Sequence, residues 1–103
     1  MSTVYDCNES DSREAGIRAA VGAAKVGRLV VLPTDTLYGI GCDAFDSEAV
    51  ASLLSAKGRG RDMPVPVLVG SWHTIDGLVL SVSADMRALV ESFWPGGLGI
   101  VVE

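Results

Sequence analysis

The sequence predicts an α/β fold in a single domain over residues 1–103. The length is that of one small domain, long enough to bury one core. A hydrophobic fraction of 49% with 20% charged residues is typical of a packed chain and excludes disorder. Apolar residues at helical spacing alternate along the chain with short β-branched runs, which indicates helices packed on a sheet.

The first helix is predicted over residues 11–26. Asp11 with Glu14 resembles a capping box, and Gly27 stops the helical pattern. The apolar positions at helical spacing are Ile17, Ala20, Val21 and Ala24. Residues 29–32 form a continuous apolar run, which predicts a strand covered on both faces and ended by Pro33.

Asp46 and Ser47 are candidate N-caps of a second helix that ends near Lys57 and Gly58. Its predicted apolar stripe consists of Val50, Leu53 and Leu54. Residues 65–69 read as a strand, placed at a sheet edge or beginning because Pro66 lacks a backbone donor.

The C-terminal third is predicted to form a short helix within residues 72–80 and a clearer helix capped by Ser83. The predicted inner face of the clearer helix carries Met86, Leu89, Val90 and Phe93. Residues 94–97 break that helix before an apolar strand at 98–102. This strand has few helices to cover it, so we expect the chain to hold an incomplete version of its domain.

The net charge of −5 argues against a broad nucleic-acid-binding surface and leaves a local basic cluster for phosphate. No apolar run approaches the ~20 residues of a membrane span, and the N-terminus is acidic, so a cytoplasmic protein is expected. Cys7 and Cys42 are too few for a zinc site or a disulfide framework, which predicts free thiols and no metal site.

The densest chemical signal is residues 33–41, PTDTLYGIG, which follow the first predicted strand as a loop. Thr34, Thr36 and Tyr38 supply hydroxyls around Asp35, a set that binds small molecules with an amine, carboxylate or hydroxyl. In open α/β sheets ligands bind beyond the carboxyl ends of strands, where this loop falls. The alternative is that these side chains only satisfy the backbone of a turn.

The second signal is residues 57–64, where Lys57, Arg59 and Arg61 alternate with glycines. Guanidinium groups match phosphate oxygens, so the loop suits a triphosphate, although no GxxxxGK[ST] or GxGxxG motif is present. The alternative is a solvated basic turn. No catalytic residue is assigned, because His73 lacks a partner and Asp35 and Asp43 could equally be capping groups.

The PTDT and YGIG segments, the AKGR sequence after a helix and FWPGG before a strand together resemble the YrdC-like family, the threonylcarbamoyl-AMP synthases. The resemblance runs over residues 15–103 and covers the N-terminal part of the family domain. It implies a twisted, mainly parallel or mixed sheet flanked by helices around a positively charged cavity.

The resemblance also implies an enzyme, a nucleotidyltransferase. L-threonine, bicarbonate and ATP, with Mg²⁺ on the triphosphate, form threonylcarbamoyl-AMP and pyrophosphate for tRNA threonylcarbamoyladenosine modification. The product would pass to a tRNA-modifying transferase. By position, Thr34, Thr36 and Tyr38 would bind L-threonine, and Lys57 and Arg59 the ATP phosphates. Arg61 is added to the ATP contacts only as an extra cation.

Several residues depart from the family pattern. Met63 stands where asparagine is common, Leu68 where histidine is often found, and Gly97 and Gly99 replace a proline and a threonine. The second half of the family site has no counterpart here. We therefore expect this chain to bind ATP weakly or not at all and not to turn over.

Two other functions stay open. One is an RNA-binding module for tRNA or double-stranded RNA, which the acidic charge disfavours. The other is a homo-oligomer in which a partner covers the strand at residues 98–102. His73 is expected at the surface or a helix end, and Trp72 and Trp94 in a core or interface.

Overall fold

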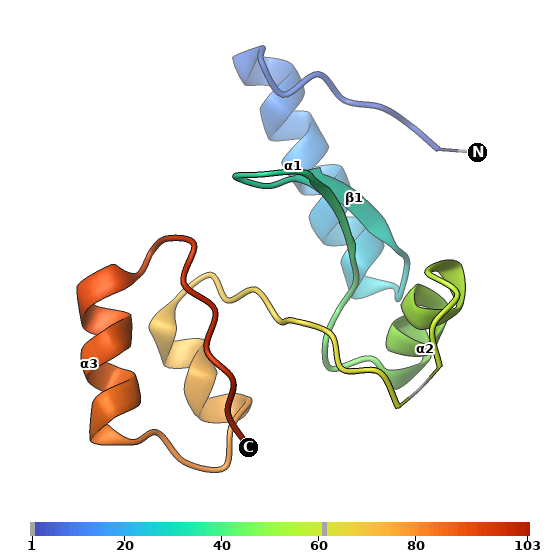
Figure 1. Cartoon of the computed structure of the whole chain (residues 1–103). Helices are drawn as coiled ribbons and strands as arrows, with labels where there is room; N and C mark the ends of the chain where they lie inside the picture. Colours follow the sequence, from blue (N-terminus) through green and yellow to red (C-terminus); the bar gives the residue numbers. More distant parts are fainter. Residues whose placement is uncertain (1, 61) are drawn as a thin grey trace. The chain divides into compact units, whose positions relative to one another are not determined.

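The computed structural model describes residues 2–60 and 62–103, and the chain divides into two compact units, Met1–Pro64 and Val65–Glu103. The first unit contains α1 (Ser10–Lys25), β1 (Val30–Pro33), β2 (Tyr38–Gly41) and α2 (Ser47–Ala56). The second contains the 3₁₀ helix η1 (Trp72–Gly77) and α3 (Ala84–Phe93) (Figure 1). The α/β class is confirmed, and the single domain over residues 1–103 stays a prediction.

Helix α1 lies within one residue of its predicted range, but its predicted capping box is wrong. The helix begins at Ser10 after Glu9, whose side chain makes no capping hydrogen bond. Asp11 therefore sits inside the first turn, where a carboxylate suits the positive end of the helix dipole. Gly27 ends the helix as predicted, with a φ of 81°.

The two strands form an antiparallel hairpin in which Val30 pairs with Gly41 and Pro33 with Tyr38. Residues 38–41, predicted as part of a loop, are therefore a strand. The pairing is antiparallel because the connection is short, whereas a parallel pair needs a crossover of about a dozen residues or more. The hairpin lies beside α1 (Figure 1).

The prediction that the first strand is covered on both faces is wrong. Val30 and Leu32 on one face are half-buried, whereas Val31 on the other is 66% exposed. Side chains alternate between the faces of a strand, so α1 covers one face and leaves the face of Val31 open.

Helix α2 follows its predicted signals closely. The Asp46 carboxylate accepts hydrogen bonds from the amides of Glu48 and Ala49, both at 3.1 Å, which confirms its role as N-cap. Leu53 and Leu54 are buried as expected, together with Ala49. Helix α2 is thus stabilised by its buried apolar stripe and by the hydrogen bonds from its N-terminal amides to the Asp46 side chain.

The second unit is built around Ile75 of η1 and Met86 and Val90 of α3. The Ser83 hydroxyl accepts from the amide of Met86 at 3.1 Å, so the predicted cap is confirmed. Half-buried side chains packed against this cluster are Val79, Val82, Trp94 and Ile100. The predicted inner face of α3 was too wide, because Leu89 and Phe93 are 42% and 60% exposed.

The strands predicted at residues 65–69 and 98–102 are wrong: in the described part of the chain neither segment belongs to a strand. Both are apolar and rich in β-branched residues, but no neighbouring strand pairs with them. Nearby, the amide of Leu80 donates to the carbonyl of Glu103 at 3.2 Å. Within residues 2–60 and 62–103, the helices all fall short of the length and apolarity needed to cross a membrane.

Candidate functional site

The hairpin tip, residues 34–37, is closed by Thr34. Its amide donates to the Leu37 carbonyl at 3.1 Å, and its hydroxyl donates to the same carbonyl. The hydroxyl also accepts from the amides of Thr36 at 3.3 Å and Leu37 at 3.1 Å. Thr34 therefore shapes the turn, which the sequence had offered as the alternative to ligand binding.

The other polar side chains of this loop are exposed. Within the described residues, the side chains of Asp35, Thr36 and Tyr38 make no hydrogen bond, and Tyr38 is 79% exposed. We call residues 34–38 the hydroxyl loop. The turn and ligand interpretations thus apply to different residues, because Thr34 stabilises the loop while Thr36 and Tyr38 keep their hydroxyls free.

Lys57 and Arg59 are positioned by the C-terminal end of α2. Gly58 has a φ of 68°, and its amide donates to the Ser55 carbonyl at 3.0 Å. The amide of Arg59 donates to the Leu54 carbonyl at 2.8 Å, which completes a Schellman motif. A side chain at Gly58 would be strained, so this glycine fixes where both cations leave the helix.

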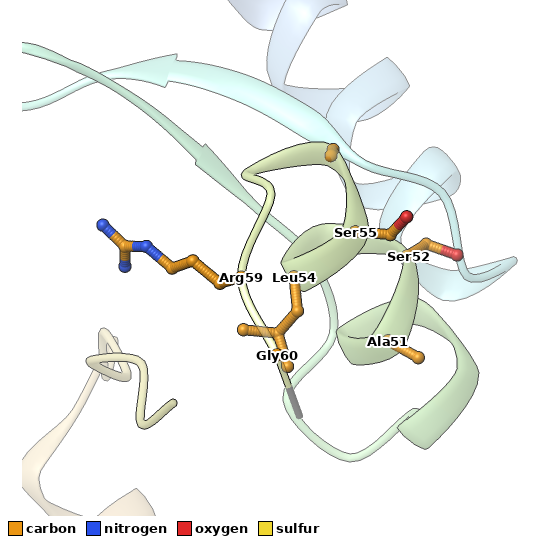
Figure 2. Close-up of a pocket in the computed structure, with 7 residues that line it drawn as sticks. Ala51, Ser52, Leu54, Ser55, Arg59 and Gly60 are labelled. Carbon is orange, nitrogen blue, oxygen red and sulfur yellow. The ribbon is translucent and has the colours of Figure 1, made fainter. Parts of the chain in front are cut away.

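We call residues 57–60 the basic loop. Lys57 and Arg59 are both exposed, and the guanidinium of Arg59 extends away from α2 (Figure 2). The negative end of the α2 dipole favours cations here. Arg61, the weakest of the predicted ATP contacts, lies outside the described residues.

An open hollow of about 710 Å³ lies against α2 and the basic loop. Its lining consists of Ala51, Ser52, Leu54, Ser55, Ala56, Arg59 and Gly60. The hydroxyls of Ser52 and Ser55 point away from the Arg59 guanidinium (Figure 2). The hydroxyl loop contributes nothing to the described lining, so a hollow shared by the two loops stays a prediction.

Cys42 follows β2 and lies close to two carboxylates. Partial burial raises the pKa of its thiol, and the charges of Asp46 and Asp43 raise it further. Both carboxylates are in structural use, since Asp43 accepts from the amide of Phe45 at 2.9 Å and Asp46 caps α2. Both cysteines are free as predicted, Cys7 exposed and Cys42 half-buried.

The remaining candidates lie in the second unit. His73 is exposed at the start of η1, as expected of a helix-end histidine, and its ring stacks on Trp72 at 4.2 Å. Trp94 packs against the core and donates from Nε1 to the Leu98 carbonyl at 2.8 Å, which confirms its role as an anchor. Trp72, by contrast, is 39% exposed beneath the guanidinium of Arg87.

The residues that depart from the family pattern are open to solvent. Met63 and Leu68 are 47% and 78% exposed, so neither contributes to a core. Gly99 has no atom within 4 Å of the position where a Cβ would stand. The structure gives Gly97 and Gly99 no role in either loop.

Residues 23–103 match the Sua5/YciO/YrdC family, which carries the description telomere recombination. Putative threonylcarbamoyl-AMP synthases of Mycobacterium tuberculosis are 65% identical over 102 residues, which is 99% of this chain and 47% of theirs. The threonylcarbamoyl-AMP synthase of Pyrococcus abyssi is 37% identical over 86 residues, 84% of this chain and 25% of that protein. This chain therefore spans about half the length of the mycobacterial relatives.

A solved structure also matches. The crystal structure of P. abyssi Sua5 complexed with L-threonine superposes with a TM-score of 0.74 and 38% sequence identity. The match covers 78% of this chain and 24% of that one. The fold of the matched part is therefore that of a known, larger protein.

Proposed function

This chain belongs to the Sua5/YciO/YrdC family, and we propose that it carries the threonine and ATP-phosphate contacts of a threonylcarbamoyl-AMP synthase. The observation that carries the proposal is the 65% identity to mycobacterial relatives of that name, over a stretch that includes both loops. The P. abyssi protein that was solved with L-threonine supports threonine as the amino-acid substrate.

The proposed reaction needs little acid or base chemistry from the protein. The threonine amine takes up bicarbonate and loses water, which gives a carbamate. A carbamate oxygen then attacks the α-phosphorus of ATP, and the bond to pyrophosphate breaks. Catalysis therefore depends on holding the reactants together and neutralising phosphate charge. Mg²⁺ enters with the triphosphate, as part of the substrate.

The hydroxyl loop is the proposed threonine contact. Thr36 and Tyr38 have free hydroxyls that can donate to a carboxylate or exchange hydrogen bonds with the threonine side chain. Thr34 acts through the loop, because its own hydroxyl is bonded to the backbone of the turn. Thr36, at the tip of the hairpin, is the residue we expect to matter most for threonine affinity.

The basic loop is the proposed phosphate contact. Arg59 presents a planar guanidinium that can bond two phosphate oxygens, and Lys57 adds a point charge beside it. Arg61 is proposed as an additional cation. Because this chain spans 47% of its relatives, we expect its own ATP affinity to be weak and its turnover absent.

Nuclear magnetic resonance titration of the full chain tests the proposal. MgATP is expected to shift the amide signals of residues 57–60, and L-threonine those of residues 34–38, each in a saturable way. D-threonine serves as the control ligand for the hydroxyl loop. Shifts spread evenly over the chain, or the same response to D-threonine, would contradict the assigned contacts. Robust pyrophosphate release by this chain alone would contradict the expected half-site.

A further inference from the structure

Gly27, which follows α1, lies against the residue that caps α2. A Cβ on this glycine would stand 2.8 Å from Oδ2 of Asp46 and 3.7 Å from its Cγ, so any other residue here would collide with the carboxylate. Gly58 also has a positive φ, of 68° against 81° for Gly27, but no atom lies within 4 Å of its Cβ position. The sequence therefore needs glycine at position 27 for two reasons, the backbone angle and the approach of Asp46.

The Asp46 carboxylate is not free to yield to such a side chain. Its Oδ1 atom accepts from the amides of Glu48 and Ala49, both at 3.1 Å. Moving Oδ2 away from Gly27 would therefore distort the N-cap of α2. Ala49 is only 2% exposed, so the first turn of α2 is fixed by burial as well as by these hydrogen bonds.

The open end of the hairpin reaches the same carboxylate. Val30, which begins β1, comes three residues after Gly27 and pairs with Gly41. Cys42 follows Gly41, and while burial raises the pKa of its thiol, the nearby charge of Asp46 raises that pKa further. The end of α1, the open end of the hairpin and the start of α2 therefore meet at Asp46. We call this meeting point of Gly27 and Asp46 the junction.

Both loops of the candidate site are carried by elements that begin at the junction. Strand β1 leads to the hydroxyl loop over four residues, about 13 Å. Helix α2 leads to the basic loop over ten residues, about 15 Å. A tilt of α2 by about 10° around its N-terminus would therefore move the basic loop by about 2.6 Å relative to the hydroxyl loop. A misplacement of about 1 Å can already lower a reaction rate about 100-fold.

We propose that Gly27 is a positioning residue for the two loops. Its missing side chain lets the Asp46 carboxylate sit against the end of α1, which sets the direction in which α2 carries the basic loop relative to the hydroxyl loop. Gly27 contacts no substrate and acts only through Asp46. The inference rests on the proposed function for what the two loops bind, whereas the junction itself is tested without ligands.

Denaturant unfolding of the full chain tests the junction. Gly27→Ala is expected to raise the unfolding equilibrium constant about 25-fold, about fivefold for the strained φ and about fivefold for the distorted cap. The matched control Gly58→Ala, with a positive φ but no neighbour, should raise it about fivefold. Asp46→Ser keeps an N-cap and removes the colliding carboxylate, so Gly27→Ala added to it should also cost only about fivefold. An effect of Gly27→Ala that is the same with and without Asp46→Ser overturns the proposal.

Nuclear magnetic resonance separates positioning from a mere loss of stability. In the folded protein Gly27→Ala should shift the amide signals of Glu48 and Ala49, whereas Gly58→Ala should leave them in place. Unmoved signals in Gly27→Ala overturn the proposal. If Gly27→Ala does not fold, folding restored by Asp46→Ser supports the proposal, and folding that is not restored overturns it.

Ligand binding shows whether the junction also serves the two loops. Gly27→Ala should bind MgATP alone and L-threonine alone within about twofold of the wild type, because each loop keeps its own residues. The effect of MgATP on threonine affinity should fall below about twofold in Gly27→Ala and return when Asp46→Ser is added. Absence of this effect in the wild type would contradict the proposed function, while the signals of Glu48 and Ala49 still decide the role of Gly27.

Discussion

The hydroxyl loop and the basic loop are both short connections, yet they are shaped in opposite ways. In the hydroxyl loop a side chain, that of Thr34, holds the backbone through three hydrogen bonds. In the basic loop the backbone holds itself through Gly58, and the side chains of Lys57 and Arg59 take no part. A polar residue in the first loop can therefore be structural, whereas the cations in the second make no hydrogen bond from their side chains within residues 2–60 and 62–103 and can contact a ligand.

The end of α1 provides an internal reference for the basic loop. There the amide of Gly27 donates to Ala24 at 3.0 Å and that of Arg28 to Ala23 at 3.0 Å, which is the same Schellman motif. Each motif thus places an arginine after its glycine. Arg28 and Arg59 share a local backbone, so a difference in phosphate binding must come from their surroundings.

The largest effect is expected on ATP affinity when the two cations of the basic loop, Lys57 and Arg59, are removed. The double variant Lys57→Ala with Arg59→Ala should weaken ATP binding by about 100-fold or more, because each of the two lost charge-assisted hydrogen bonds contributes about 1.5–3 kcal/mol. Titration of MgATP followed by nuclear magnetic resonance measures the change. Arg28→Ala is the matched control and should leave the affinity unchanged. Equal losses would mean that overall charge, not the basic loop, attracts ATP.

The next effect tests the backbone of the basic loop. Gly58→Ala places a side chain at a φ of 68° and should lower the free energy of unfolding by about 1 kcal/mol. Gly22→Ala, inside α1 with no atom within 4 Å of its Cβ position, should raise it by about 0.5–1 kcal/mol. Thermal or denaturant unfolding measures both variants. Changes of opposite sign in the free energy of unfolding would support the role of Gly58 in shaping the basic loop. A Gly58→Ala variant as stable as the wild type would contradict that role.

The third effect separates two residues of the hydroxyl loop. Thr34→Val removes the hydroxyl that closes the turn and should cost about 1 kcal/mol of stability. Thr36→Val should change stability by less than about 0.5 kcal/mol, because its side chain makes no hydrogen bond among the described residues. Threonine affinity should fall in both variants. Equal losses of stability in the two variants would show that Thr34 does not hold the turn more than Thr36 does.

The smallest effect is expected on the reactivity of the Cys42 thiol, which lies between the two loops in the sequence. Burial and the charges of Asp46 and Asp43 raise the pKa of its thiol from the usual 9.0, so it should react with iodoacetamide more slowly than exposed Cys7 at pH 8. Its contribution to stability is fully present below pH 9 and is lost as pH rises through the raised pKa of the folded state. Asp46→Asn should speed the reaction of Cys42 and leave that of Cys7 unchanged.

The sequence predicted helix ends well because their signals are local. Asp46, Ser83, Gly27 and Gly58 each act within one turn of their helix, so their roles followed from spacing alone. The strand at residues 38–41 was missed because its glycines disfavour strands, and its pairing depends on the turn at Thr34. Residues 65–69 and 98–102 have strand-forming side chains, but a strand also requires a neighbour.

The sequence predicted which residues belong to the candidate site, but it did not predict which of them shape the loop and which contact a ligand. The spacing located both loops, and it offered a turn and a ligand contact as alternatives for the first. Only the three-dimensional structure shows that the Thr34 hydroxyl closes the turn and that, in the part of the chain it describes, the hydroxyls of Thr36 and Tyr38 make no hydrogen bond. Whether a residue's hydrogen-bonding capacity is already in use depends on backbone geometry, which the sequence pattern does not contain.

The two loops are proposed to bind neighbouring parts of one substrate set. The most direct test is the affinity of the full chain for L-threonine, measured with and without saturating MgATP, in the wild type and in Arg59→Ala. Ligands that share a site change each other's affinity reciprocally. We expect MgATP to alter threonine affinity at least fivefold in the wild type, and this change to disappear in Arg59→Ala. Threonine binding that is the same with and without MgATP in both proteins would contradict binding of the two ligands at adjoining loops.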